Sequence, residues 1–193
     1  HIVSSKYVLE AAFPQGLYAP EHIQDDMPKL RSRMWAATSL TGNAGDYVYY
    51  GNRAGQGMGM QRKPDQSAEL RLKLRPEDFR NIYSVLGITA EPIYQSTETN
   101  LFDPRTRPWY QVAQNAPGQV WTPVYIDFNA KDLVMTRARS VQSSQGEHDG
   151  VVATDVFLNS LRVFVDHLQL AKGAVAFVME PNGDLIAATH LAN

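Results

Sequence analysis

The sequence of 193 residues predicts an α+β fold, because helical and strand patterns occupy separate parts of the chain. Apolar residues recur every three or four positions in the first forty residues, which is typical of helices. From Asp46 onward the pattern changes to short runs rich in valine and tyrosine, bounded by glycine and asparagine. The two patterns do not alternate regularly, so a doubly wound parallel sheet is not expected.

Two helices are expected at the N-terminal end, in residues 2–13 and 21–40. Apolar side chains repeat at helical spacing in the second of these segments, at Ile23, Met27, Leu30, Met34 and Ala37. Pro28 either kinks this helix or lies in its first turn, since proline is tolerated there and is costly further inside a helix.

Short antiparallel strands are expected next, as a meander of residues 47–50, 57–61 and 69–73. Residues 76–100 carry weak signals, with two short strands at 83–86 and 92–94 inside an otherwise irregular segment. Irregular segments of this length often cover a binding site. We therefore expect a covering loop here that becomes ordered when a ligand binds.

The second half of the chain is expected to form a short helix, three strands and a connecting helix, in residues 108–115, 120–128, 133–141, 150–156 and 157–170. A buried strand at 174–179 and a returning strand at 185–188 then form a hairpin. An isolated hairpin is only marginally stable in water. We expect it to begin a second module that is missing here or is completed by something else. The start at His1, without an initiator methionine, favours a piece of a longer protein.

The composition excludes several classes of function. Eighteen basic and twenty acidic residues give a net charge of -2 without a dense basic block, so nucleic acid is not expected as a partner. The absence of cysteine excludes disulfides, thiol catalysis and thiolate metal sites, and it is compatible with an oxidising compartment. The five histidines are scattered without metal-ligand spacing. The sequence predicts no metal site and no cofactor.

The most informative segment is 102–110, which reads FDPRTRPWY and is followed by Tyr125 and Asp155. An arginine can donate two parallel hydrogen bonds to a carboxylate. An aspartate beside aromatic faces suits an ammonium group. This set of side chains therefore predicts recognition of a small zwitterion and not catalysis.

Each of these residues also has a purely structural interpretation. Asp103 and Arg105 are expected to form an Asx-type turn and an ion pair. The large rings of Trp109, Tyr110 and Trp121 are explained equally well as core aromatics. Asp155 follows an apolar run, and a buried carboxylate needs a partner, which is either Arg107 or a ligand.

The chain resembles the double Cache family, the extracytoplasmic sensor domains of bacterial transmembrane receptors. The resemblance rests on Asp-Pro-Arg-x-Arg-Pro-Trp-Tyr at 103–110, on Trp121 and Tyr125, and on Gly-Val-Val-Ala-x-Asp at 150–155. It implies a long N-terminal helix packed along two PAS-like modules, of which the one farther from the membrane holds the ligand. The expected division is a helical entry at 1–40, the membrane-distal module with its connecting helix at 41–170, and the start of the membrane-proximal module at 171–193.

Members of this family that bind amino acids are similar in their site residues. The resemblance implies that Arg107 and Trp109 hold the ligand carboxylate, and that Tyr110, Tyr125 and Asp155 hold its ammonium group. A tyrosine of the family pattern is replaced here by Phe102, which has no hydroxyl to donate to that carboxylate. One hydrogen bond to a charged group is worth roughly 1.5–3 kcal/mol. An amine is therefore expected to be less affected by this replacement than an α-amino acid.

The expected function is ligand sensing by the periplasmic part of a membrane-anchored receptor, with non-covalent binding of an amino acid or amine and no enzymatic activity. The output is expected from a methyl-accepting chemoreceptor, a histidine kinase or a nucleotide cyclase such as a diguanylate cyclase. A homodimer along the entry helices is implied by the family alone. Two alternatives stay open: a hydrolase that uses Asp127, Asp155 or another carboxylate pair, and a ligand-free structural or dimerisation module in which Arg107 and Asp155 neutralise each other.

Overall fold

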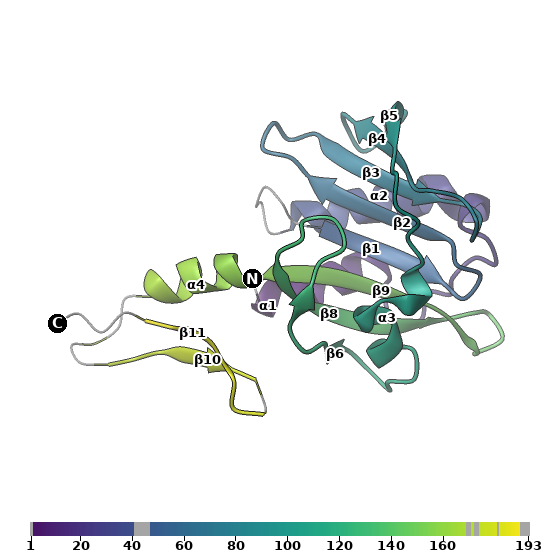
Figure 1. The fold of residues 1–193 in the computed structure, drawn as a ribbon. Coiled ribbons are helices and arrows are strands. Elements are labelled where there is room, and N and C mark those ends of the chain that lie inside the picture. Colours follow the sequence, from purple (N-terminus) through teal and green to yellow (C-terminus); the bar gives the residue numbers. More distant parts are fainter. Residues whose placement is uncertain (1, 41–46, 169–170, 172–173, 181, 190–193) are drawn as a thin grey trace.

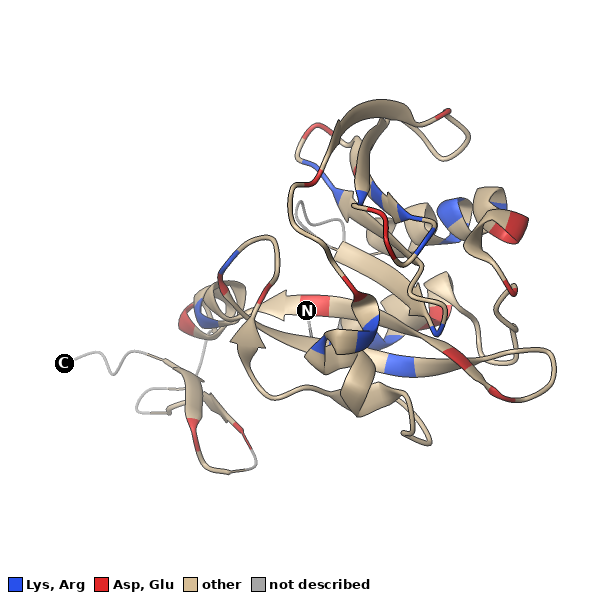
Figure 2. Ribbon diagram, turned by 45° about the vertical axis from the view of Figure 1, so that its right-hand side comes forward, with Lys and Arg blue, Asp and Glu red and all other residues tan. Residues whose placement is uncertain are grey.

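A computed structural model describes residues 2–40, 47–168, 171, 174–180 and 182–189. One large antiparallel sheet forms the body of the protein, with helices packed on it (Figure 1). This arrangement confirms the predicted α+β class, with a PAS-like antiparallel sheet next to the N-terminal helices. Acidic and basic residues are interspersed along the ribbon (Figure 2).

The large sheet has nine strands in the order β5-β4-β3-β2-β1-β9-β8-β6, and β7 also pairs with β8. The chain first builds a meander outward from β1 and later adds β9 on the other side of β1. The longest pairing joins the two ten-residue strands β8 and β9. The strands are β1 Tyr47–Asn52, β2 Gly57–Arg62, β3 Ala68–Lys73, β4 Asn81–Val85, β5 Ile93–Thr97, β6 Val120–Trp121, β7 Tyr125–Ile126, β8 Leu133–Gln142 and β9 His148–Phe157.

Two helices cover one face of this sheet, α1 (Ile2–Ala12) and α2 (Met27–Ser39) (Figure 1). Their apolar side chains form the main core with the residues of β1 and β2 that point toward them. The predicted helix 21–40 is shorter than expected, because the short 3-10 helix η1 (Ile23–Asp26) precedes α2. Of the two interpretations of Pro28, the first-turn position is confirmed.

The opposite face of the sheet is covered by the segment that carries the FDPRTRPWY motif. This segment forms a 3-10 turn, η2 (Pro104–Thr106), and the short helix α3 (Pro108–Ala113). A second core lies between it and the sheet, where Trp109 packs against Tyr49 of β1 with 4.9 Å between ring centroids.

Two predictions in the middle of the chain are wrong. Residues 76–100 are not an irregular covering loop, because β4 and β5 continue the meander of the large sheet, although these strands overlap the two short ones expected at 83–86 and 92–94. Every residue of β5 is exposed, so the strand has no apolar alternation that the sequence could reveal. The strand predicted at 120–128 is instead two short strands, β6 and β7. Pro123 lies between them and has no N–H to donate to a neighbouring strand.

The C-terminal part forms the helix α4 (Leu158–Asp166) and a separate two-stranded sheet of β10 (Phe177–Met179) and β11 (Leu185–Ala188). The hairpin is confirmed, but its first strand is not buried, since Phe177 is 59% and Met179 is 48% exposed. Residues 169–170 of the predicted connecting helix lie outside the described residues. Among the helices of the described residues, none combines the length and the apolar character needed to cross a bilayer.

Candidate functional site

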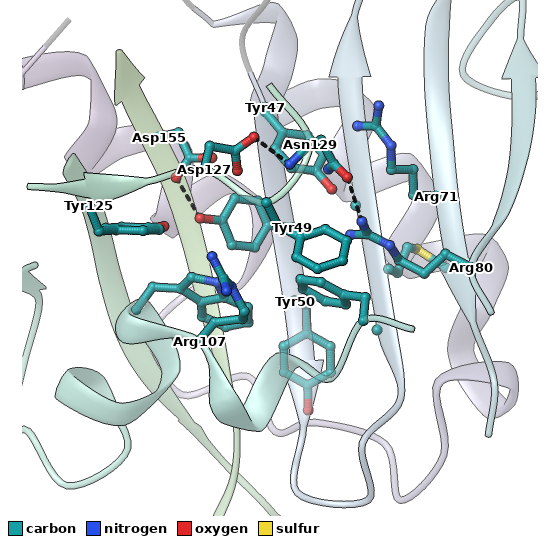
Figure 3. A pocket seen from close by; sticks show the side chains of 16 residues that line it. Tyr47, Tyr49, Tyr50, Arg71, Arg80, Arg107, Tyr125, Asp127, Asn129 and Asp155 are labelled. Atoms are coloured by element: carbon teal, nitrogen blue, oxygen red, sulfur yellow. Dashed lines mark hydrogen bonds between the residues drawn. The ribbon is translucent and has the colours of Figure 1, made fainter. Parts of the chain in front are cut away.

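A cavity lies between the sheet face that α3 covers and the segment from Phe102 to Asn129 (Figure 3). Its volume is about 20 Å³, which is room for about one water molecule. An adjoining cavity of about 180 Å³ shares four of its lining residues, namely Tyr47, Arg71, Asp127 and Asn129. The two cavities together lie over the middle of the large sheet.

Local interactions within the motif shape one wall of the cavity. The Asp103 carboxylate accepts a hydrogen bond of 3.0 Å from the backbone N–H of Arg105. It also forms an ion pair with the Arg105 guanidinium at 2.7 Å. These contacts confirm the predicted Asx-type turn and ion pair. The turn packs closely on β1, since a Cβ atom on Gly51 would lie 2.4 Å from the Pro104 side chain and 3.0 Å from Trp109. Only glycine at position 51 allows this approach.

Asp155 of β9 lies in the cavity wall and is held by hydroxyl groups. Tyr49 donates to its carboxylate at 2.5 Å (Figure 3). Thr136, the cross-strand neighbour of Asp155 on β8, donates at 2.6 Å. The Tyr125 hydroxyl lies 2.6 Å from that of Thr136. Because Thr136 gives its hydrogen to Asp155, Tyr125 is the donor in this contact. Tyr125, Thr136 and Asp155 therefore form a chain of hydrogen bonds that ends on the Asp155 carboxylate.

The pKa of Asp155 is raised to about 7. Burial is the main cause and the nearby Asp127 carboxylate adds to it, while the two hydroxyl donors and the Arg107 charge act in the opposite direction. Burial and the Asp155 charge also raise the pKa of the Tyr49 and Tyr125 hydroxyls, which therefore stay neutral donors. Among the described residues, no cationic side chain forms an ion pair with Asp155.

Arg107 lies on the other side of the cavity, just before α3 (Figure 3). Its guanidinium is 5.8 Å from the ring centroid of Tyr125 and 5.5 Å from that of Phe128. It donates a long hydrogen bond of 3.4 Å to the Ile126 carbonyl. In the described part of the chain Arg107 has no ion pair with Asp155. The direct neutralisation that the ligand-free structural alternative expects is therefore not observed.

The far end of the cavity contains arginines that the sequence did not indicate. Arg80 is almost fully buried, pairs with Glu98 through two contacts of 2.7 and 3.0 Å, and donates to the Asn129 side chain at 2.7 Å. Its guanidinium stacks on the Phe102 ring at 3.8 Å. Arg71 pairs with Glu69 and lies 3.5 Å from Glu98. These arginines are compensated by carboxylates, in contrast to Arg107.

The structure brings together five of the six predicted site residues around the cavity: Phe102, Arg107, Trp109, Tyr125 and Asp155. Tyr110 lies elsewhere, with its hydroxyl 3.1 Å from Nε2 of His148. Consecutive helical residues point about 100° apart, and in α3 it is Trp109 and not Tyr110 that lines the cavity. Trp121 also lies away from it, packed beside α4. Tyr49 lines the cavity but was not predicted as a site residue. Successive side chains of a strand point to opposite faces, so the sequence of β1 could have indicated that Tyr49 faces away from the side of Val48 and Tyr50.

No arrangement of side chains in the described residues suggests a metal, since no three histidines, aspartates or glutamates there come together as ligands. The site is instead a small aromatic cavity with a cation and an acid on opposite walls. Such a site suits a ligand that carries both charges.

A family model for the first PDC sensor domain of methyl-accepting chemotaxis protein-like proteins matches residues 47–163, which include the whole cavity. The chain belongs to this family. The match confirms the resemblance to double Cache sensor domains and covers all strands of the large sheet together with α3. The domain that this family describes is a sensor domain.

Curated relatives and solved structures agree with this PDC sensor family. The chain is 36% identical over 85 residues to the chemotaxis protein PscA of Pseudomonas syringae pv. tomato, which is 44% of this chain and 13% of PscA. It is 34% identical over 85 residues to adenylate cyclase 1 of Rhizobium meliloti, which is 44% of this chain and 12% of the cyclase. The chain thus corresponds to a small part of much longer relatives.

The fold is similar to that of the ligand-binding domain of the Campylobacter jejuni chemoreceptor Tlp3, which was solved in complex with 4-methylisoleucine. The TM-score is 0.61 at 18% sequence identity, over 96% of this chain and 60% of the Tlp3 domain. At this identity the comparison shows the fold alone. It confirms the PAS-like sensor architecture.

Proposed function

We propose that this chain is the extracytoplasmic ligand-sensing part of a bacterial transmembrane receptor and that its cavity binds an amino acid or an amine without reacting with it. The observation that supports this most strongly is Asp155, a carboxylate in an aromatic cavity with hydroxyl donors but no cation beside it in the described structure. Asp155 is partly buried, and a carboxylate that is removed from water without a cationic partner is costly to a protein. A cationic ligand removes this cost when it binds.

The ligand ammonium group lies beside Asp155, with the faces of Tyr49 and Tyr125 around it. The ligand carboxylate, where there is one, lies at Arg107 and Trp109 on the opposite wall. This arrangement keeps the roles that the sequence predicted, except that Tyr49 takes the place of Tyr110. Phe102 closes the carboxylate side with an apolar ring and gives no hydrogen bond there.

The cavity must widen to admit such a ligand, because an amino acid is much larger than one water molecule. Asp127 and Asn129 line both the cavity and the adjoining one of about 180 Å³, and both belong to the segment that covers the sheet. Outward movement of this segment joins the two volumes. Binding then favours one of two arrangements of the cover, which is the condition for a signal.

The family and the fold support a proposed place for the chain in a receptor. Residues 1–40 form the helical entry, residues 41–170 the membrane-distal module with its connecting helix, and residues 171–193 the start of a membrane-proximal module. The relatives include chemotaxis proteins and a cyclase, so this kind of sensor is joined to more than one kind of output. A methyl-accepting chemoreceptor is the output that the family favours.

A thermal-shift screen of amino acids and their matching amines tests the proposal. A ligand at one hundred times its dissociation constant adds about 2.7 kcal/mol to the free energy of unfolding. Asp155→Asn should weaken the binding of every hit by about thirtyfold or more, since it removes one partner of a buried charge pair. Asp149→Asn is the matched control, because Asp149 also accepts from a tyrosine at 2.5 Å but does not line the cavity.

The alternative of a hydrolase has one observation in its favour, the raised pKa of Asp155 near the second carboxylate of Asp127. Recovery of the ligand after prolonged incubation separates the two functions. A sensor returns the ligand unchanged, whereas a hydrolase converts it. A complete lack of hits among amino acids and amines, or equal binding by Asp155→Asn, would contradict the sensor proposal.

A further inference from the structure

A second and larger cavity lies at the edge of the large sheet and shares no lining residue with the first. Its volume is about 640 Å³, and its walls come from α1, residues 15–18, residues 114–119 and β8. The strand β6 pairs with β8 only at Ala138 and Arg137. Beyond these positions α1 and the two loops surround the edge of β8, which leaves this space open.

The walls of the second cavity are positively charged. They contain Lys6, Arg137 and Arg139 but only one acidic residue, Glu10, so their formal charge is +2 when His148 is neutral. Burial lowers the pKa of His148, which keeps its ring neutral at pH 7. The chain as a whole has a charge of -2. This local excess of positive charge therefore favours an anion in a protein that is otherwise slightly acidic.

Polar atoms in the wall have hydrogen-bonding capacity that the described residues do not use. The Gln119 side chain donates to Glu10 at 2.9 Å, but its own Oε1 is buried and accepts no hydrogen bond from them. The Nε of Arg139 is 3.6 Å from Glu10 and also lacks a hydrogen bond. Buried polar atoms normally have partners. An acceptor and a donor in one wall suit a solute that has both a carboxylate and a hydroxyl.

The spacing of the two arginines indicates the shape of the solute. Arg137 and Arg139 are two residues apart on one face of β8, which separates their Cα atoms by about 7 Å. A guanidinium has five N–H donors, so each can hold one carboxylate although Arg137 also donates to Ser5 and Arg139 to the Phe13 carbonyl. We propose that this cavity binds a small organic dicarboxylate, with one carboxylate at each arginine and Lys6 as a third cationic contact. A dicarboxylate offers a separate carboxylate to each guanidinium, which a single phosphate does not.

Calorimetric titration of the whole chain with succinate and with malate tests the proposal. Both should bind with saturation, and malate about fivefold more tightly, because its hydroxyl can donate to Gln119. Lys6→Gln and Arg137→Gln should each weaken binding about tenfold or more. Lys29→Gln is the matched control, since Lys29 is exposed on α2 and pairs with Asp26. Arg107→Gln, in the first cavity, should leave succinate binding unchanged.

The proposal would be overturned if neither dicarboxylate binds, or if inorganic phosphate binds as tightly as succinate. It would also be overturned if Arg107→Gln loses succinate binding while Lys6→Gln keeps it unchanged. Arg137 also contacts Ser5 and the Trp121 ring, so the thermal unfolding of its variant is measured first. Lys6 is exposed on α1, and its variant decides the question if Arg137→Gln does not fold.

Discussion

Two neighbouring tyrosines of β1 make the same hydrogen bond in different surroundings. Tyr49 donates to Asp155 at 2.5 Å, and Tyr50 donates to Asp149, near the other end of β9, also at 2.5 Å. Asp149 has the guanidinium of Arg53 3.7 Å away. In the described structure Asp155 has no such cation and lies at the wall of a cavity.

The comparison separates a structural carboxylate from a functional one. Successive residues of a strand point to opposite faces, so the Tyr50 ring packs with Phe13 under the helices, although Tyr50 also contributes to the cavity lining, while the Tyr49 ring packs with Trp109 on the cavity side. On the helix side the protein supplies the cation itself. On the cavity side that place is left for a ligand, and the charge of Asp155 is correspondingly unfavourable until the ligand arrives.

The largest expected effect is a difference in the pH dependence of stability between the unaltered protein and Asp155→Asn. The folded-state pKa of Asp155 is about 7, above its usual value, so the folded state binds the proton more tightly than the unfolded state does. Its contribution to stability is therefore fully present below about pH 4 and is lost as pH rises through 7. Relative to Asp155→Asn, the ligand-free protein should lose roughly 2–4 kcal/mol of unfolding free energy between pH 4 and pH 8. Parallel urea-denaturation results for the two proteins would contradict this.

Removal of the Tyr50 hydroxyl should affect stability but not binding. Tyr50→Phe leaves Asp149 without its donor, and one hydrogen bond to a charged group is worth about 1.5–3 kcal/mol. The free energy of unfolding should fall by this amount while ligand affinity stays within twofold. Tyr49→Phe is the matched variant and should weaken ligand binding. The comparison fails if Tyr50→Phe weakens binding more than Tyr49→Phe does.

Addition of a hydroxyl on the carboxylate side should sharpen selectivity. Phe102→Tyr introduces a donor next to the place proposed for the ligand carboxylate. An amino acid should then bind about tenfold more tightly, whereas the amine without the carboxylate should bind as before. Calorimetry with such a matched pair measures the difference. An equal gain for both ligands would mean that the carboxylate does not lie beside position 102.

The smallest effect is expected at Tyr110. Its hydroxyl contacts His148 and does not reach the cavity, so Tyr110→Phe should change ligand affinity by less than about threefold. Titration calorimetry of this variant beside Tyr49→Phe is the appropriate measurement. A tenfold loss in Tyr110→Phe would restore Tyr110 as a contact of the ammonium group.

Much of the fold could be predicted because its elements have regular local patterns. The helices, the meander from β1 to β3 and the hydrophobic parts of β8 and β9 follow from apolar spacing. The strand β5 was predicted only in part, at 92–94, since it is exposed along its whole length and is stabilised by pairing with β4. The short strands β6 and β7 depend on the tertiary partner β8, which local sequence does not reveal.

The site was predicted in part, for a related reason. Arg107, Trp109 and Asp155 belong to a recognisable motif, and the structure places them around one cavity. Arg80 was missed because its position at the cavity depends on a long-range pair with Glu98 and a contact with Asn129. Tyr110 was assigned to the cavity because adjacent motif residues were treated as one group, although a helix turns them in different directions.

The most direct test is a titration of the Asp155 side chain by carboxyl-detected NMR, with and without a bound amino acid or amine. In the free protein its pKa should be about 7. Saturation with a cationic ligand should lower the pKa well below that, because the ammonium group stabilises the charged carboxylate. A pKa in the ordinary range of an exposed aspartate, or one that does not change when the ligand binds, would contradict the account.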